Sequence, residues 1–326
     1  MKKVLFATTA LVATAGMAAA DVSFGGFGRF GMIYKDADGS DSTTHIEQRF
    51  RLTVTGTATS DNGLEFEGRI RFQSDDNGEG ASNTAQSSAA GFAVSTGGFR
   101  LDVGHVSDVI DSGDVLNYYG YGIGLTSFLE QSSNFSLPAS GFGTSADFAT
   151  IAPTVKLRYN MGDFSFAVSY TDDAETIAIG EPSTINNGSL AAGGGSSEFQ
   201  IGAGYSFGNY SVGAAFGSTE DGVAIGEDND FWVLNFGGDV GAFGFSVLVG
   251  DSDAQDGTSY GFSVKYDIGA ATEVRFVYSE SGADGDDTDG YGIGFRHGLG
   301  GGVTLAGGIG DNGGTTTADL GVVFNF

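Results

Sequence analysis

The segment Arg49-Phe-Arg-Leu-Thr-Val-Thr55 alternates at every position between a charged or polar side chain and an apolar one. Successive side chains of a β-strand point to opposite faces of the sheet, so this period of two predicts a strand with one polar and one apolar face. The segment Ser60-Asp-Asn-Gly63 then predicts a tight turn, because Asn and Gly tolerate positive φ. The returning segment 64–74 alternates in the same way, and the whole stretch therefore predicts a β-hairpin.

The same alternation continues to the end of the chain and predicts about sixteen strands, an even number that suits an antiparallel barrel. These strands cover residues 22–34, 46–60, 64–74, 89–96, 99–106, 154–161, 164–172, 198–207, 210–218, 230–238, 243–251, 258–267, 272–280, 289–298, 302–310 and 316–326. Short turns such as Gly97-Gly98 alternate with long acidic loops such as 173–197. This difference between hairpin ends is typical of an all-β, transmembrane antiparallel β-barrel. A soluble β-sandwich is the alternative, but it explains neither this difference nor the many charges within the strands.

The first twenty residues differ from the rest of the chain. A basic start, Lys2-Lys3, precedes the apolar segment 4–17, and Ala18-Ala-Ala20 matches the small-residue pattern of a cleavage site. This order of features predicts a secretory signal peptide over 1–20, cleaved near Ala20. The remaining residues, 21–326, then form a single barrel domain.

Composition excludes several classes of protein. The chain has 326 residues, no cysteine and a net charge of −27, which becomes −29 when the two lysines of the signal peptide are lost. So acidic a chain is a poor ligand for nucleic acid. No run of about 18 apolar residues follows residue 21, so no membrane-spanning helix is predicted, whereas barrel strands cross a membrane with about 9–11 residues each. Hydrogen bonds and packing, without disulfides, must hold the fold.

Nearly all basic residues of the predicted strands lie in the polar register, between apolar neighbours. The outward face of a barrel in lipid must be apolar, so this polar register faces a water-filled lumen. Six arginines from the first five strands are expected to form one basic patch, here called the arginine wall: Arg29, Arg49, Arg51, Arg69, Arg71 and Arg100. The simpler interpretation is a solvated lumen face with local ion pairs, such as Glu67 with Arg49 or Arg71.

Residues 107–153 form the one long stretch without a clear period. Unstructured connections longer than about 15 residues are uncommon in compact domains unless they are functional. We predict that this loop, named L3, folds into the barrel and narrows it. Its acids would then face the arginine wall: Asp108, Asp111, Asp114, Glu130 and Asp147. Opposed charges across a narrow gap set a transverse field and a size limit. An external loop that covers the rim is the alternative.

The sequence predicts neither a catalytic nor a metal site. The three histidines, His45, His105 and His297, lie far apart and lack metal-ligand spacing, and no nucleophile elbow accompanies them. Two acidic stretches have oxygen-rich spacing suited to Ca²⁺, although neither completes an EF-hand. We interpret them as solvated loops, with calcium as the weaker interpretation. The calcium candidates are Asp36, Asp38, Asp284 and Asp286.

Three motifs, Ser60-Asp-Asn-Gly-Leu-Glu-Phe66, Tyr205-Ser-Phe-Gly-Asn-Tyr-Ser-Val-Gly213 and Ala318-Asp-Leu-Gly-Val-Val-Phe-Asn-Phe326, resemble those of the general porins of Rhodobacter and other alphaproteobacteria. The resemblance spans 21–326. It implies a sixteen-stranded homotrimer in the outer membrane of a Gram-negative bacterium, in contact with lipid and lipopolysaccharide, with its third external loop folded into the pore. It also implies acidic loops able to bind calcium. The terminal Phe326 resembles the signal that the outer-membrane assembly machinery reads. L3 lacks the Pro-Glu-Phe-Gly-Gly run of the enteric porins.

These observations predict a passive channel for small hydrophilic solutes and ions that catalyses no reaction. A solute-specific channel on the same barrel is one alternative, and saturable flux would identify it. A plugged structural or adhesive barrel is the other, and it would not conduct. Small residues near Gly26, Gly28, Gly308 and Gly310 are expected to face outward and to form the contact between subunits of a trimer.

Overall fold

The computed structural model describes residues 20–76, 78, 81–137, 153–172, 197–220, 229–285 and 287–326. No helix in this part of the chain is long and apolar enough to cross a membrane. The strands are β1 (Ala20–Ala37), β2 (Thr43–Thr59), β3 (Glu65–Asp75), β4 (Gln86–Ser87), β5 (Gly91–Thr96), β6 (Phe99–Gly104), β7 (Thr154–Met161), β8 (Phe164–Asp172), β9 (Ser197–Phe207), β10 (Tyr210–Glu220), β11 (Asn229–Val240), β12 (Phe243–Ser252), β13 (Ser259–Asp267), β14 (Thr272–Glu280), β15 (Asp289–Gly300), β16 (Val303–Asn312) and β17 (Thr315–Asn325).

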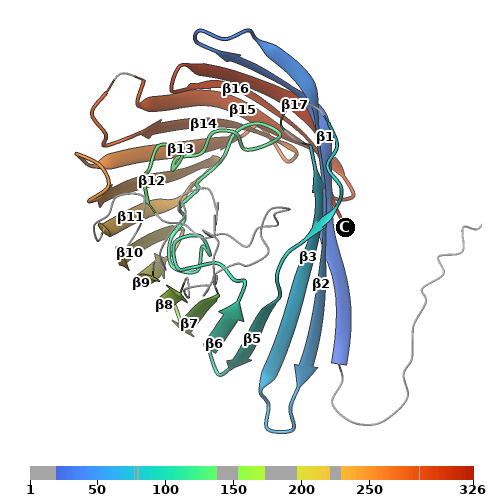
Figure 1. The fold of residues 1–326 in the computed structure, drawn as a ribbon, viewed down its shortest axis with the longest axis vertical. Helices are drawn as coiled ribbons and strands as arrows, with labels where there is room; N and C mark the ends of the chain where they lie inside the picture. The colour runs from blue at the N-terminus through green and yellow to red at the C-terminus, as the bar shows by residue number, and fades with distance from the viewer. Residues whose placement is uncertain are drawn as a thin grey trace, which may run out of the picture.

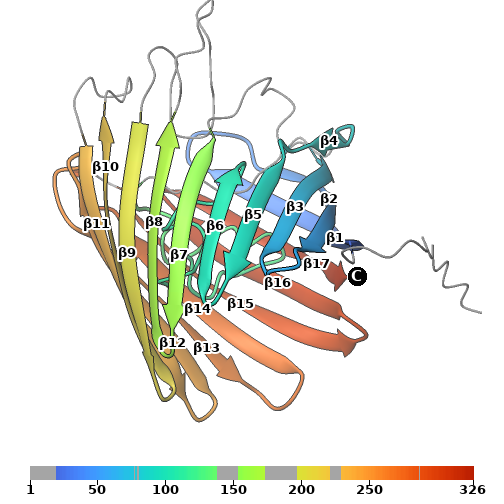
Figure 2. The ribbon, with the colours of Figure 1, turned by 90° about the horizontal axis from the view of Figure 1, so that it is seen from below.

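Sixteen of these strands form a closed ring in which every strand pairs antiparallel with its neighbours in the chain (Figures 1 and 2). β1 closes the ring against β17, in register from Phe27↔Asn325 to Ala37↔Thr315. Closure continues beyond the last strand, where the backbone N–H of Phe326 donates to the carbonyl of Gly26 at 3.1 Å. The remaining strand, β4, pairs only with β3 and lies outside the ring. The predicted antiparallel β-barrel is confirmed.

Strand boundaries follow the alternation of the sequence closely. The predicted ranges 154–161, 164–172 and 272–280 coincide with β7, β8 and β14. β1 is longer than predicted at both ends, and the two-residue β4 was not predicted, because two residues cannot display a period of two. Gly97 and Gly98 form the tight β5–β6 turn with φ of 55° and 88°, a conformation that glycine adopts without steric cost.

The two faces of the barrel wall differ as lipid and water require. On β1 and β2, Phe30, Met32 and Phe50 are 56%, 60% and 49% exposed, whereas Arg29, next to Phe30, retains only 11% of its side-chain surface. Apolar side chains therefore face outward and basic ones inward. Near the short turns, Phe164, Tyr205 and Phe207 stack in a row with centroids 4.4 and 5.7 Å apart. Such rows belong to the aromatic girdle at a membrane interface.

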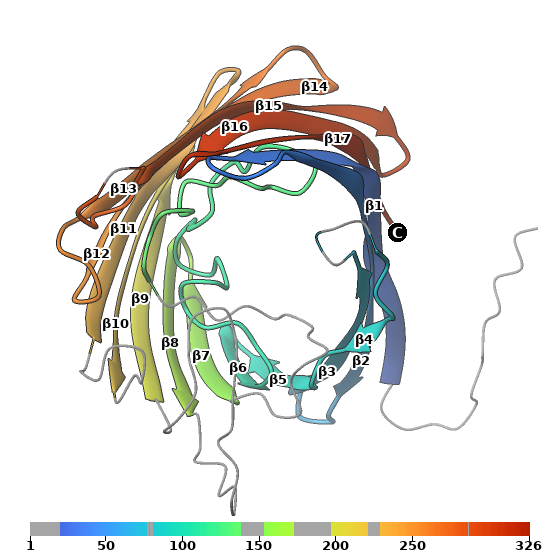
Figure 3. The ribbon, with the colours of Figure 1, turned by 45° about the horizontal axis from the view of Figure 1, so that its top comes forward.

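The described part of L3, together with the two residues before it, spans 105–137 and lies inside the ring (Figure 3). It follows the inner faces of the strands from β7 onward, while β2 and β3 lie on the facing side of the ring. Two hydrophobic clusters form beneath L3. The larger packs Val109 and Ile110 of the loop against Phe231 and Leu248 of the wall, and the smaller joins Ile123 and Leu129 to Val277. The predicted inward fold of L3 is confirmed.

Candidate constriction of the barrel lumen

Polar side chains of the strands accept hydrogen bonds from the backbone of L3. The amide of Ile110 donates to Oε1 of Gln200 on β9 at 3.0 Å, and the amide of Asn117 donates to Oδ1 of Asn235 on β11 at 3.1 Å. Both acceptors are buried, with exposures of 0% and 3%. Because an unpaired buried N–H costs about 1–3 kcal/mol, these contacts let an irregular loop lie against a sheet whose own hydrogen bonds are already satisfied.

The tip of L3 is held by a single carboxylate. Asp319 on β17 is 6% exposed, and it accepts hydrogen bonds from the amide of Leu125 at 2.8 Å and the amide of Thr126 at 2.9 Å. The hydroxyl of Thr126 donates to it as well, at 2.9 Å. Charge-assisted bonds of this kind are about twice as strong as neutral ones. The tip is therefore fixed on the far side of the barrel from the strand at which L3 starts.

Inward-facing glycines of the strands let L3 approach the wall closely. A Cβ on Gly213 of β10 would lie 2.1 Å from the carbonyl oxygen of Val115, and a Cβ on Gly261 of β13 would lie 1.9 Å from that of Gln131. Neither space admits a side chain, because the obstacle is backbone. These inward-facing glycines were not predicted to contact L3, although glycine recurs at alternate positions of the inward register in several later strands.

Two basic residues of β7 hold the start of L3. Lys156 Nζ lies 2.7 Å from Oδ2 of Asp114, and Nη1 of Arg158 donates to the other carboxylate oxygen. Burial alone would raise the pKa of Asp114, but Lys156 and Arg158 together lower it below its ordinary value. Asp114 therefore remains ionised and paired at neutral pH.

A polar cavity of about 210 Å³ lies beside this ion pair. The arginine-wall residues Arg69 and Arg100 line it together with Lys156 and Arg158, and Asp102 and Asp114 supply the acids. The two basic residues of β7 were not among the predicted site residues, although they lie in the same polar register. The cavity thus carries more basic than acidic groups, which makes it electropositive.

The arginine wall extends across β1, β2, β3 and β6. Its ion pairs are Arg29 with Glu47 at 2.6 Å, Arg49 with Asp75 at 2.5 Å, and Arg100 with Glu67 at 3.1 Å. Arg51 donates to Oε1 of Gln73 at 2.5 Å and lies over the ring of Phe27. The pairing proposed for Glu67 with Arg49 or Arg71 was wrong, since Glu67 reaches Arg100 across β5. Thus acids balance part of this basic patch.

The acids of L3 lie in different environments. Asp111 accepts a hydrogen bond from the hydroxyl of Tyr119 at 2.5 Å. Asp108 was predicted to face the arginine wall, but it is 0% exposed. Its carboxylate accepts a hydrogen bond from the amide of Asp111 at 2.7 Å. It stabilises the loop backbone and does not reach the lumen. Asp147 lies outside the described residues.

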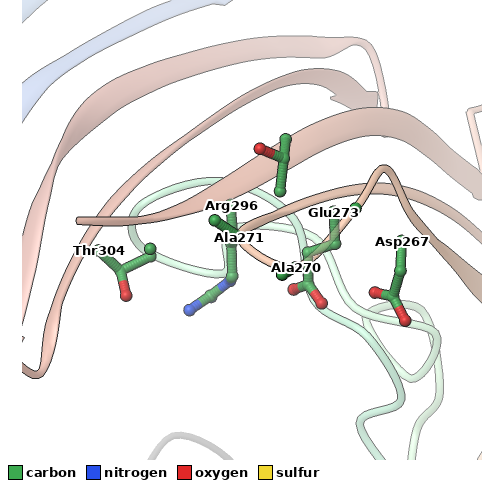
Figure 4. Close-up of a pocket in the computed structure, with 9 residues that line it drawn as sticks. Asp267, Ala270, Ala271, Glu273, Arg296 and Thr304 are labelled. Carbon is green, nitrogen blue, oxygen red and sulfur yellow. The ribbon is translucent and has the colours of Figure 1, made fainter. Parts of the chain in front are cut away.

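A second basic group lies on β13, β14 and β15. The cations of Lys265 and Arg275 lie 5.6 and 6.0 Å from the ring centroid of Tyr121 on L3, and Nη1 of Arg275 donates to the carbonyl of Gly122 at 2.8 Å. A polar cavity of about 460 Å³ opens beside it, at the end of the barrel with short turns, and Arg296 projects into it (Figure 4). Acids balance this second group, because Lys265 lies 3.8 Å from Asp239 and from Asp267, and Arg275 pairs with Glu273.

The calcium candidates that the structure describes do not converge on a site. Asp36, Asp38 and Asp284 are exposed, and Asp286 lies outside the described residues. Asp36 accepts the hydroxyl of Tyr34 at 3.1 Å. Within the described ranges, the single group of His, Asp and Glu side chains whose ligand atoms lie close together includes none of these aspartates.

The expected outward patch of small residues is wrong at Gly308. A Cβ there would lie 2.9 Å from the amide nitrogen of Gly124 on L3, so this position faces the lumen. Gly310 faces the same way, toward Ile123. Gly28 does face outward, but the ring of Phe324 covers it. Two of these glycines thus accommodate L3 and do not form an outer surface.

Glu130 gives the lumen a predicted pH dependence. Burial raises the pKa of Glu130 to about 7, Arg296 opposes this shift and Asp111 adds to it. Because this pKa lies above its ordinary value, the Glu130 carboxyl is neutral below about pH 7 and negatively charged above it. Burial disfavours the charged form, so the attachment of L3 to the wall weakens as pH rises. We expect cation preference, measured as reversal potential in a salt gradient, to increase between about pH 6 and pH 8. The increase should be lost in Glu130→Gln; an equal increase in that variant would contradict the assignment.

A closed sixteen-stranded barrel with a polar, charged lumen and a loop fixed inside it defines a membrane channel protein. The chain belongs to the Gram-negative porin family, whose model matches residues 7–317. It is 31% identical over 312 residues to a porin of Fuscovulum blasticum and 27% identical over 331 residues to a porin of Rhodobacter capsulatus, covering in both cases 94% of this chain and 100% of the relative. An engineered triple mutant of Rhodopseudomonas blastica porin superimposes with a TM-score of 0.77 at 26% identity, covering 94% of this chain and 100% of that one. The predicted resemblance is confirmed, and the chain forms a porin channel of the outer membrane.

Proposed function

We propose that this porin is a general diffusion channel whose constriction lies between L3 and the arginine wall. The observation that carries the proposal is the polar cavity between the two, which Arg69 and Arg100 of the wall line together with Ser112 and Asp114 of the loop. Ions and hydrophilic solutes pass along such a surface, whereas apolar solutes would have to disrupt its ordered water. The channel acts passively and catalyses no reaction.

Its assembly follows the same proposal. The signal peptide is cleaved near Ala20, at the start of β1. The mature chain inserts among lipid and lipopolysaccharide with the help of the assembly machinery that reads Phe326, and three copies form a homotrimer. Calcium stays a proposed ligand of the exposed acidic loops and is not required for conduction.

The test is single-channel conductance in planar bilayers, with reversal potential measured in a salt gradient. We expect ohmic steps in groups of three, and we expect Arg69→Ala/Arg71→Ala to move ion preference toward cations, because two positive charges leave the wall. Lys35→Ala removes an exposed cation near the end of β1 and should leave the preference unchanged.

Three other results of these measurements would each support a different conclusion about the channel. Unchanged preference in the double variant would move the filter elsewhere in the barrel. Saturable flux blocked by one solute would support the solute-specific channel. A reconstituted protein that never conducts would support the plugged barrel and contradict the proposal.

A further inference from the structure

Three side chains with metal-binding chemistry meet at the end of the barrel where the long loops lie. His45 and Glu47 are two residues apart on the inward face of β2, and Asp76 directly follows β3. One ligand atom from each lies within 4.8 Å of the others. Glu47 is only 6% exposed. The three residues therefore form a small, partly enclosed donor set.

The contacts around these residues orient them toward one another. Arg29 lies 2.6 Å from Oε1 of Glu47, which leaves Oε2 for a further ligand. Asp76 accepts the amide of Gln48 at 3.0 Å through Oδ2 and the amide of Gly78 at 2.6 Å through Oδ1. Both carboxylates are thus held in place by groups other than a metal, so the donor set is formed in advance.

The ligand atoms of the two carboxylates lie within 4.8 Å of each other and of the imidazole. Carboxylates this close repel each other, and a cation bound between them would remove that repulsion. The imidazole of His45 supplies a third ligand for such a cation, whereas a proton shared by two carboxylates would not require one.

The donor types select the class of metal. Ca²⁺ and Mg²⁺ take oxygen ligands, whereas imidazole is a typical ligand of zinc and other divalent transition metals. Zinc sites with three protein ligands from His and carboxylate leave a position for water. One His, one Glu and one Asp match this pattern.

We propose that His45, Glu47 and Asp76 bind a divalent transition-metal ion of the Zn²⁺ type at the outer end of the lumen. The next inward-facing residue of β2 is Arg49, so the ion would lie directly beside the arginine wall. It adds two positive charges there and moves ion preference toward anions. It also links β2 to the start of the loop that follows β3.

The test is isothermal titration calorimetry on the folded, untagged, EDTA-treated protein in detergent, with ZnCl₂ and separately with CaCl₂. We expect one Zn²⁺ per chain, bound more tightly than Ca²⁺. His45→Ala should weaken zinc binding by at least about tenfold, a loss on the scale seen when even supporting groups of metal sites are removed. Asp76→Asn should weaken it too, while its amide oxygen still accepts the Gln48 amide and keeps the loop folded.

The matched control is His297→Ala on β15, because this histidine hydrogen-bonds Thr272 at 2.7 Å and belongs to no group of metal-ligating side chains in the described structure. It should bind zinc as the wild type does. Zinc binding that is equal in His45→Ala and wild type, absent from wild type, or weaker than calcium binding would overturn the proposal. These measurements do not require conduction, so they remain decisive if the diffusion channel itself is disproved.

Discussion

Replacing Asp319 by alanine is expected to release the tip of L3 and to turn a steady open channel into one with frequent brief closures. The substitution removes the acceptor of three hydrogen bonds, two from backbone amides of Leu125 and Thr126 and one from the Thr126 hydroxyl. Hydrogen bonds to charged groups contribute about 1.5–3 kcal/mol each, so attachment of the tip loses on the order of 3 kcal/mol or more. A tip that leaves the wall enters the lumen and obstructs current.

Single-channel recording measures this effect, and limited proteolysis within L3 provides a second readout that does not depend on current. The control is Asp311→Ala on the neighbouring strand. Asp311 accepts hydrogen bonds from Gly314 and Thr316 of its own hairpin and none from L3 in the described structure. A quiet Asp319→Ala channel whose loop resists protease as well as the wild type does would show that other contacts hold the tip.

The second large effect is expected from Gly213→Ala, a change of one methyl group. The new Cβ would lie 2.1 Å from the carbonyl oxygen of Val115 and 2.7 Å from Cβ of Leu116. Overpacking of this kind typically costs about 1–3 kcal/mol, and here the obstacle is backbone that no rotamer change can relieve. We expect L3 to be displaced from β10, with a lower thermal midpoint of unfolding and an altered single-channel conductance.

Gly56→Ala on β2 is the matched control, since the nearest atom to its Cβ would be the carbonyl oxygen of Gly68 at 4.0 Å. Both glycines lie inside paired strands, so replacing glycine by alanine changes the conformational freedom of the backbone equally in the two variants. Circular dichroism during heating and bilayer recording compare the two variants. If they behave alike, L3 does not lie as close to the wall as the structure places it.

The local sequence pattern predicted the strands of the ring, but it did not predict features that depend on contacts between residues far apart in the chain. β7, β8 and β14 have the predicted bounds because each is a paired segment between turns, and its side chains alternate between lipid and water. β4 was missed because its two residues are placed by pairing with β3 and not by any pattern of their own.

The length and position of L3 predicted that it folds inward, but they could not predict the role of each acid. Asp108 and Asp114 are equally acidic in sequence, yet one is fully buried beneath the loop backbone and the other is paired with Lys156 and Arg158. Their difference arises from which strand each meets when the loop crosses the barrel. The zinc donor set has the same origin, because β2 pairs with β3 and brings Asp76 beside His45 and Glu47.

The sequence by itself determined that this chain is a barrel with an apolar outside, a charged inside and one long loop. Alternation is a local property, because each side chain of a strand contacts either lipid or water according to its own position. Only the tertiary structure decided where L3 runs, because that path depends on pairs such as Asp319 with Leu125, which are 194 residues apart. No local period records such a pair, since its free energy is gained only after the ring has closed.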